Sequence, residues 1–211
     1  MATKPRWRRQ KETRPGDIVR AALDVFTEKG FAGARMEEIA ARAGVSKGAP
    51  YLYFQTKEDL FAAVVREAFE PKLEPVLALI ASHEGALEPL LRAMTQHGAH
   101  LAATTQLGQV MKLVISESRT FPEIARIWHD NLLARGLDAL TSLIERAQQR
   151  GEIRPGDPRL HALSLIAPLP VGVIFRETFV PTGAKPFDLA ALMNQHLDTV
   201  LPGLLTKESS T

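Results

Sequence analysis

The stretch of sequence that decides the fold runs from Glu38 to Ala49 and reads Glu-Ile-Ala-Ala-Arg-Ala-Gly-Val-Ser-Lys-Gly-Ala. Two closely crossing helices need a small residue in the first helix, which Ala40 supplies. The turn between them needs a residue that tolerates positive φ, which Gly44 supplies. Val45 then fills the space between the helices, and Ser46 is a suitable N-cap for the second one. The spacing alone fits both a helix-turn-helix and an ordinary helical hairpin.

Hydrophobic periodicity predicts helices on both sides of this stretch. Upstream, apolar residues from Ile18 to Phe26 follow a helical spacing, and Gly30 ends that helix. Downstream, residues 56–59 form a capping box that opens a further helix, and Pro71 and Pro75 are expected to close or kink it.

The rest of the chain is predicted to be a larger helical bundle. Longer helices are expected over 87–101, 107–118, 122–151, 157–179 and 188–201, with Pro168 and Pro170 bending the fourth of these. No internal repeat and no strand pattern is visible. The fold class is therefore all-α, with a three-helix helix-turn-helix domain followed by a helical-bundle domain.

Composition and charge narrow the function classes. The 211 residues include no cysteine, which excludes a disulfide scaffold, a thiolate nucleophile and cysteine-based metal sites. The longest uncharged apolar run, Ala162–Phe175, is too short to cross a bilayer, and no apolar segment follows the basic N-terminus, so a cytoplasmic protein is expected. Residues 1–60 contain 12 Lys and Arg against 8 Asp and Glu, whereas the remainder contains 14 against 16. A basic end on a slightly acidic chain fits a polyanionic partner or a solvated tail.

Catalytic and cofactor motifs are absent from the sequence. It contains no phosphate-binding glycine loop, no G-x-S-x-G and no H-E-x-x-H, so neither an enzyme nor a cofactor is expected. His129 and Asp130 are adjacent, and on a helix their side chains are expected to diverge. His97 and His100 are spaced for one helix face, but no third ligand lies at a useful spacing, so no metal site is expected.

A longer set of motifs resembles the N-terminal domain of the tetracycline-repressor (TetR) family. These motifs are Phe-Thr-Glu-Lys-Gly-Phe (26–31), Met-Glu-Glu-Ile-Ala (36–40), Ala-Gly-Val-Ser-Lys-Gly (43–48), Tyr-Leu-Tyr-Phe (51–54) and Lys-Glu-Asp-Leu-Phe (57–61). The resemblance implies a homodimeric, ligand-responsive regulator that binds operator DNA, most often a repressor, with a basic arm at 1–13, a DNA-binding domain at 14–56 and a ligand-binding and dimerisation domain at 57–211. The effector is expected to be a small apolar or amphipathic molecule. A nonspecific or architectural DNA-binding protein without an inducer is the alternative.

The resemblance also assigns residues to the DNA contact. Lys47 and Gly48 match positions that approach the major groove, and Tyr51 and Lys57 match positions that contact phosphate. The full expected set is Arg35, Ser46, Lys47, Gly48, Ala49, Tyr51, Tyr53 and Lys57. Residues 3–13, with Trp7 among arginines, either lie along the minor groove or form a tail that adds salt-sensitive affinity.

Three positions depart from the family pattern. Arg35 stands where a Ser or Thr usually caps the second helix, so that cap is expected to be missing. Ala49 lacks the hydroxyl of a frequent Thr. Pro50 removes a backbone N–H from the recognition helix, expected over 46–53, and is expected to push Ala49 out of α geometry and to distort or delay that helix.

The second domain carries weaker indications. The segment from Val114 to Ile124 resembles C-terminal domains called AefR-like, which does not define a ligand. The last two long helices are expected to form the dimer interface, with the residues Leu163, Ile166, Ile174, Leu192 and Val200 as candidates. A pocket between the middle helices is expected to be lined by Met94, His97, Leu101, Met111, Ile115, Phe121, Trp128 and Phe175, although packing in the core is the commoner use of such side chains.

Overall fold

The computed structural model describes residues 15–206 of the chain, and every named element in that range is a helix. The expected basic arm at 1–13 lies outside the described residues. The all-α prediction is confirmed for the described part, where Ile153 and Leu205 add one isolated antiparallel β-bridge.

The elements follow one another with short connections. In chain order they are α1 (Pro15–Gly33), α2 (Met36–Ala43), the 3-10 turn η1 (Pro50–Leu52), α3 (Lys57–Ser82), α4 (Leu87–Thr104), α5 (Leu107–Glu117), α6 (Pro122–Trp128), the π-helical segment η2 (His129–Leu133), α7 (Ala134–Gln149), α8 (Pro158–Ile166), α9 (Pro168–Thr178), the 3-10 turn η3 (Val180–Thr182) and α10 (Leu189–Leu204).

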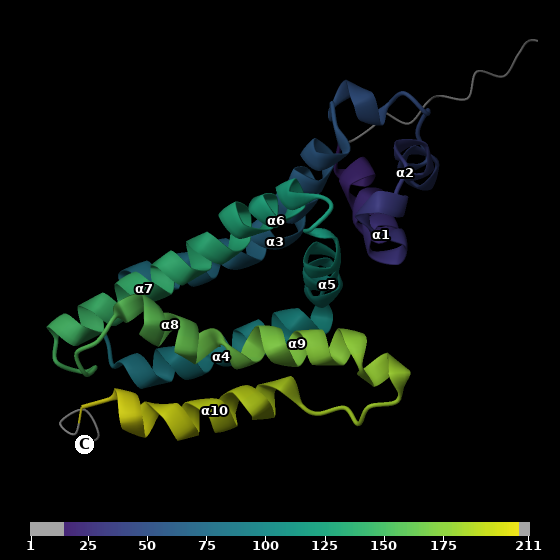
Figure 1. The fold of residues 1–211 in the computed structure, drawn as a ribbon. Helices are drawn as coiled ribbons and strands as arrows, with labels where there is room; N and C mark the ends of the chain where they lie inside the picture. The colour runs from purple at the N-terminus through teal and green to yellow at the C-terminus, as the bar shows by residue number, and fades with distance from the viewer. Residues whose placement is uncertain (1–14, 207–211) are drawn as a thin grey trace, which may run out of the picture.

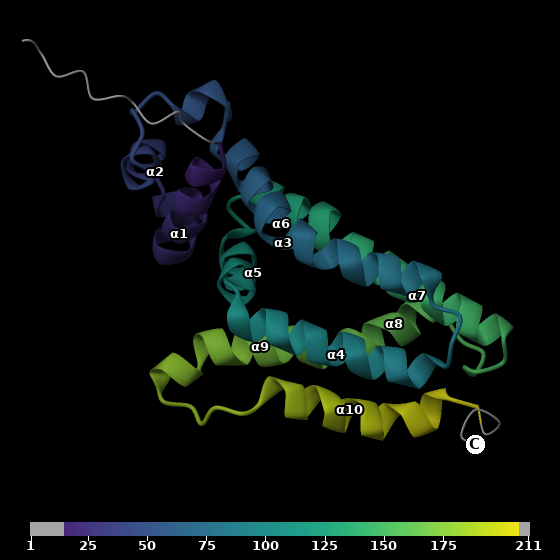
Figure 2. The same ribbon diagram turned by 180° about the vertical axis from the view of Figure 1, so that it is seen from behind.

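The helices form a small unit at one end and two longer layers beyond it (Figure 1). α1, α2 and η1 make the small unit, and α3 runs out of it with α6 and α7 alongside. α4, α9 and α10 form the second layer, and α5 crosses between the two layers, as the opposite view also shows (Figure 2). α3 therefore belongs to both parts of the molecule.

Two main hydrophobic clusters stabilise this arrangement. The first surrounds the rings of Phe26, Phe31 and Phe61, and it continues into Val110 of α5 and Trp128 of α6. The second joins the end of α3 to α4, α7, α8 and α10. Because the first cluster contains side chains from both α1 and α5, the small unit packs directly on the larger bundle rather than being tethered to it.

The two prolines of α3 do not end it. Thr56 and Asp59 form the predicted capping box, in which the Thr56 hydroxyl accepts from Asp59 N–H and the Asp59 carboxylate accepts from Thr56 N–H. Of the two effects expected from Pro71 and Pro75, closing the helix is wrong, because α3 continues to Ser82, and kinking it stays a prediction. Both prolines are exposed and four residues apart, so the backbone groups that they leave unpaired lie on the solvent side of the helix.

The prolines of the fourth predicted long helix have a stronger effect. α8 and α9 meet at Ala167, and Pro168 occupies the first position of α9, where a missing N–H costs nothing. The segment Pro158–Thr182 comprises α8, α9 and η3. By length and composition it is long and apolar enough to cross a bilayer, and only 17% of its most apolar window is buried. An apolar surface left exposed in a single chain also marks a protein–protein interface.

Candidate DNA-binding surface and apolar cavity

The turn of the predicted helix-turn-helix forms as expected. α2 ends at Gly44, whose φ of 71° and ψ of 30° lie in the left-handed region. The Gly44 N–H donates to the carbonyl of Ala41, and the Val45 N–H donates to that of Ala40. Arg35 precedes α2 without a capping side-chain hydrogen bond, which confirms the missing cap.

The second helix of the motif is distorted, as expected from Pro50. Residues 47–49 form a turn and only Pro50–Leu52 are helical, as a 3-10 turn, so a full α-helix over 46–53 does not form. Pro50 has no N–H to donate to the carbonyl of Ser46, and the Ala49 N–H donates to that carbonyl instead, at 2.9 Å. The expectation that Pro50 displaces Ala49 from α geometry is also wrong, because Ala49 keeps φ −61° and ψ −39°. Both residues are buried, and this packing overrides the local bias.

Most of the residues expected to contact DNA lie on the surface of the small unit. The exposed members are Arg35, Ser46, Lys47, Gly48, Tyr51 and Tyr53. Ala49 is buried, so its methyl group serves the core. Leu52, between the two tyrosines, is 79% exposed, and the sequence analysis assigned it no role.

Lys57 points into the protein instead of outward. Its Nζ donates to the carbonyls of Phe31 at 2.5 Å and Ala34 at 3.2 Å, and it lies 4.5 Å from the centroid of the Phe31 ring. The ammonium thus satisfies carbonyls that the end of α1 leaves without helical donors. This geometry favours a structural role over the phosphate contact expected from the resemblance.

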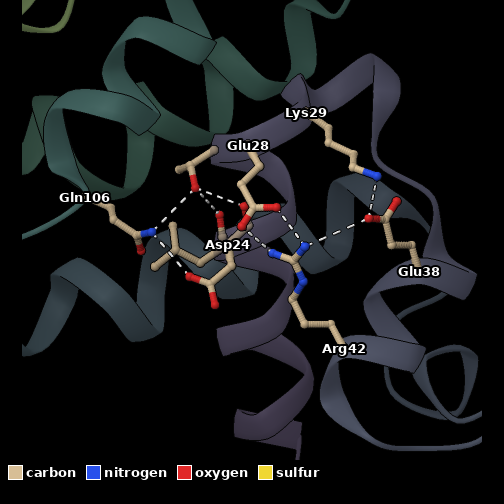
Figure 3. Close-up of polar contacts among 8 residues, drawn as sticks. Asp24, Glu28, Lys29, Glu38, Arg42 and Gln106 are labelled. Atoms are coloured by element: carbon tan, nitrogen blue, oxygen red, sulfur yellow. Dashed lines mark hydrogen bonds and ion pairs between the residues drawn. The ribbon is translucent and has the colours of Figure 1, made fainter.

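A polar network holds α2 against α1 (Figure 3). The guanidinium of Arg42 donates to both carboxylate oxygens of Glu28, at 2.5 and 2.7 Å, and Lys29 pairs with Glu38 at 2.6 Å. The hydrogen bond from Arg42 lowers the pKa of the Glu28 carboxyl, and the same bond raises the pKa of Arg42. Gln106 adds a link to the larger bundle, since its amide donates to Asp24 at 3.2 Å.

The exposed cation of the motif is loosely held. Lys47 Nζ lies 3.4 Å from the carboxylate of Glu37, and the Lys47 side chain is 75% exposed. The Glu37 pKa is lowered by its own backbone N–H and then by Lys47. A surface pair of this kind contributes little to folding and can be exchanged for a phosphate.

An apolar cavity of about 290 Å³ lies in the larger bundle, lined by side chains of α3, α4, α7 and α9 among others. Five predicted pocket residues line it, namely Met94, His97, Leu101, Met111 and Trp128. The other three do not. Ile115 is 61% exposed, the Phe121 ring packs edge-on against Phe31, and Phe175 packs against Phe179 and Phe187. Ile115 and Phe175 lie on faces of α5 and α9 that do not line the cavity, and Phe121 precedes α6 and packs toward the small unit.

Sequence analysis missed the contribution of α3 to this cavity. Phe69, Lys72, Leu73, Val76 and Leu77 all line it. The expected end of the helix near Pro71 concealed their helical spacing, which continues across both prolines.

Two groups of polar residues were considered as catalytic or metal-binding candidates, namely His129 with Asp130 and His97 with His100. The expectation that His129 and Asp130 diverge is wrong, because the His129 Nδ1 lies 2.7 Å from the Asp130 carboxylate in the π-helical segment η2, whose geometry differs from that of an α-helix. Both side chains are exposed. Within residues 15–206 no group of three or more metal-ligating side chains is found.

Comparison with known protein families decides the class of protein. Residues 18–64 match the profile of bacterial regulatory proteins of the tetR family, and residues 81–190 match that of the tetracyclin repressor-like C-terminal domain. This chain belongs to the tetR family. It is a DNA-binding transcriptional regulator and not an enzyme. The likeness of the segment from Val114 to Ile124 to AefR-like domains stays a prediction.

Individual relatives match nearly the whole length of this tetR-family protein. The fatty acid metabolism regulator protein of Bacillus subtilis is 29% identical over 200 residues, covering 94% of this chain and 100% of that one. The transcriptional repressor BepR of Brucella suis is 30% identical and covers 92% of both chains. The crystal structure of the regulator FadR from Bacillus subtilis, in complex with stearoyl-CoA, superposes with a TM-score of 0.73 at 26% identity, covering 90% of this chain and 99% of that one.

Proposed function

We propose that the protein is a homodimeric repressor whose affinity for operator DNA falls when a small apolar or amphipathic molecule occupies the cavity of its larger domain. The observation that carries this proposal is the position of α3. The helix begins at Lys57, shortly after the 3-10 turn η1 of the helix-turn-helix, and its later residues line the cavity. A ligand that displaces α3 therefore acts on the element that positions the DNA-binding surface.

Two further contacts support a mechanical connection between the domains. The Glu117 carboxylate, at the end of α5, accepts hydrogen bonds from the backbone N–H groups of Phe31 at 2.9 Å and Ala32 at 2.7 Å. Gln106, before the start of α5, donates to Asp24. Linkage requires that the ligand and the DNA weaken each other's binding by the same factor.

The effector class rests on the lining of the cavity and on a relative. Nearly all of its lining side chains are apolar, which fits a ligand with an apolar body. The relative FadR was crystallised with stearoyl-CoA, a molecule with such a body.

Dimerisation is proposed to use the last helices, as expected from the resemblance. α8, α9 and α10 would pack against their copies in the partner as a helical bundle. Leu163 is exposed, and Ile166, Ile174, Leu192 and Val200 are half-buried in the single chain. The low burial of Pro158–Thr182 supports this placement.

The DNA contact is proposed for the exposed residues around the turn. Ser46, Lys47 and Gly48 approach the major groove, and Arg35, Tyr51 and Tyr53 lie beside them on the same unit. Two such surfaces in a dimer suit a roughly palindromic operator with half-sites about one helical turn apart or somewhat more. The division of the chain at residues 56 and 57 is kept, with α3 serving both domains.

The first experiment measures binding to DNA from upstream of the protein's own gene against scrambled DNA across a salt series. A ratio of about 10³ or more at physiological salt supports a specific regulator, whereas equal and steeply salt-dependent binding favours the architectural alternative. Decan-1-ol and decanoate are then added to the complex, and release of operator DNA is expected.

A cavity-filling variant makes this experiment specific. Gly136 lines the cavity, and a Cβ at this position meets no atom within 4 Å. Gly136→Phe is expected to keep operator binding and to lose release by the two amphiphiles. Gly203→Phe is the matched control, because Gly203 is also open at Cβ but lies in α10 outside the lining. Release that persists in Gly136→Phe contradicts the effector role of the cavity.

A further inference from the structure

The charge of the cavity lining is one-sided. The residues that line it include one lysine, Lys72, and one histidine, His97, and no Asp or Glu. A cation at the edge of an apolar space without a carboxylate leaves its charge unpaired on that side, and an anionic group entering the space would pair with it.

The acidic neighbours of Lys72 along α3 are already engaged elsewhere. Glu70 and Glu74 both pair with Arg135 of α7, the first at 3.2 Å. Lys72 lies two residues from each of them and thus on the other side of the helix. Among residues 15–206 no carboxylate lies within ion-pair distance of its ammonium.

The ammonium itself retains donor capacity. Lys72 is half-buried as a residue, and its Nζ donates one hydrogen bond, of 2.5 Å, to the carbonyl of Ala68 one turn earlier. An ammonium carries three N–H donors, so two remain for another acceptor.

The two threonine hydroxyls of the lining offer less. The hydroxyl protons of Thr95 and Thr105 are donated to the carbonyls of Leu91 and Leu101 within α4. A cationic ligand would find no carboxylate, whereas an anionic head group would form charge-assisted hydrogen bonds with Lys72.

We infer that the cavity selects an amphiphilic carboxylate, with its apolar body among the leucine and methionine side chains and its acidic head group bound by Lys72. The inference rests on the proposed effector function of the cavity and specifies the chemical class of the ligand. Lys72 is the residue that distinguishes the anion from a neutral molecule of equal length.

The test compares two probes of equal length, decanoate and decan-1-ol, by isothermal titration calorimetry on the full chain at concentrations below micelle formation. Wild-type protein is expected to bind decanoate at least tenfold more tightly than decan-1-ol. Lys72→Met, which keeps most of the side-chain volume, is expected to lose that preference while binding decan-1-ol as before. Lys112→Met is the matched control, because Lys112 also donates to a backbone carbonyl, that of Glu177 at 2.8 Å, but lies outside the lining.

The outcomes separate this inference from the function on which it rests. Loss of the decanoate preference in Lys72→Met but not in Lys112→Met supports the inference. Equal binding of both probes to wild type, or a preference unchanged in Lys72→Met, overturns the inference and leaves an apolar effector cavity in place. Binding of neither probe overturns the inference together with the proposed effector function. Unfolding midpoints of the variants are measured in urea, and a preference lost with an unchanged midpoint excludes misfolding as its cause.

Discussion

Gly30 lies against the carboxylate of Glu117, so closely that a Cβ at position 30 would stand 2.3 Å from Glu117 Oε1. The glycine has φ 76° and ψ 169°, a conformation essentially restricted to glycine, and it kinks α1 so that the next two N–H groups face the carboxylate. Hydrogen bonds to the Glu117 carboxylate therefore join the kink of α1 to the end of α5. Movement of α5 by a ligand would act on α1 directly.

Gly30→Ala is expected to lower the free energy of unfolding by about 1–3 kcal/mol, because alanine is strained at this φ and its methyl group would displace Glu117. Urea denaturation measures the change. Gly33→Ala is the control, since a Cβ at position 33 would lie 3.6 Å from the Cβ of Lys29, an ordinary van der Waals contact. The double variant Gly30→Ala with Glu117→Ala should lose less unfolding free energy than the two single variants lose in total, because the shorter side chain at position 117 removes the clash. Full additivity would contradict the coupling between these residues.

Lys47 and Lys57 are expected to respond to substitution in opposite ways. Lys47→Met should weaken binding to duplex DNA and reduce the slope of log affinity against log salt by about 1, because its exposed ammonium can exchange the Glu37 carboxylate for a phosphate. Lys57→Met should leave that slope unchanged and lower the unfolding free energy by about 1–3 kcal/mol, because three-way contacts to the end of α1 are lost. Fluorescence anisotropy across a salt series and urea denaturation provide the two measurements. A reduced slope in Lys57→Met would restore the phosphate role expected from the sequence.

Local patterns predicted the elements whose geometry depends on neighbours in the sequence. The turn at Gly44 and the capping box at Thr56 follow from residues within a few positions, and each forms as expected. The inward turn of Lys57 could not be predicted, because its carbonyl partners lie more than twenty residues away. The contribution of α3 to the cavity was hidden for a different reason, since prolines usually end a helix and α3 continues across both of them.

The stability of the small unit is expected to depend on pH through Glu28. Its folded pKa is lowered by the hydrogen bond from Arg42, so the stabilisation is present above the unfolded pKa and is lost as the pH falls through the folded value. The difference in urea midpoint between wild type and Glu28→Gln should therefore be largest near neutral pH and shrink below about pH 4. Glu145→Gln, at an exposed position of α7, serves as the control and should show no such convergence. A constant difference from pH 7 to pH 3 would show that the pair with Arg42 contributes nothing.

Leu163→Glu is expected to convert the dimer into monomers. Leu163 lies on α8 and is 41% exposed in the single chain, within the apolar run proposed as the interface. A carboxylate there would be buried without a partner at the centre of two packed copies, which costs several kcal/mol per dimer. Leu79→Glu is the matched control, because Leu79 is 49% exposed on α3, outside that surface. Sedimentation velocity at micromolar concentration should give monomers for the first variant and dimers for the second. The monomer should also lose most of its operator affinity, because one recognition surface contacts only one half-site. A dimer that survives Leu163→Glu but dissociates in Leu79→Glu would move the interface to α3.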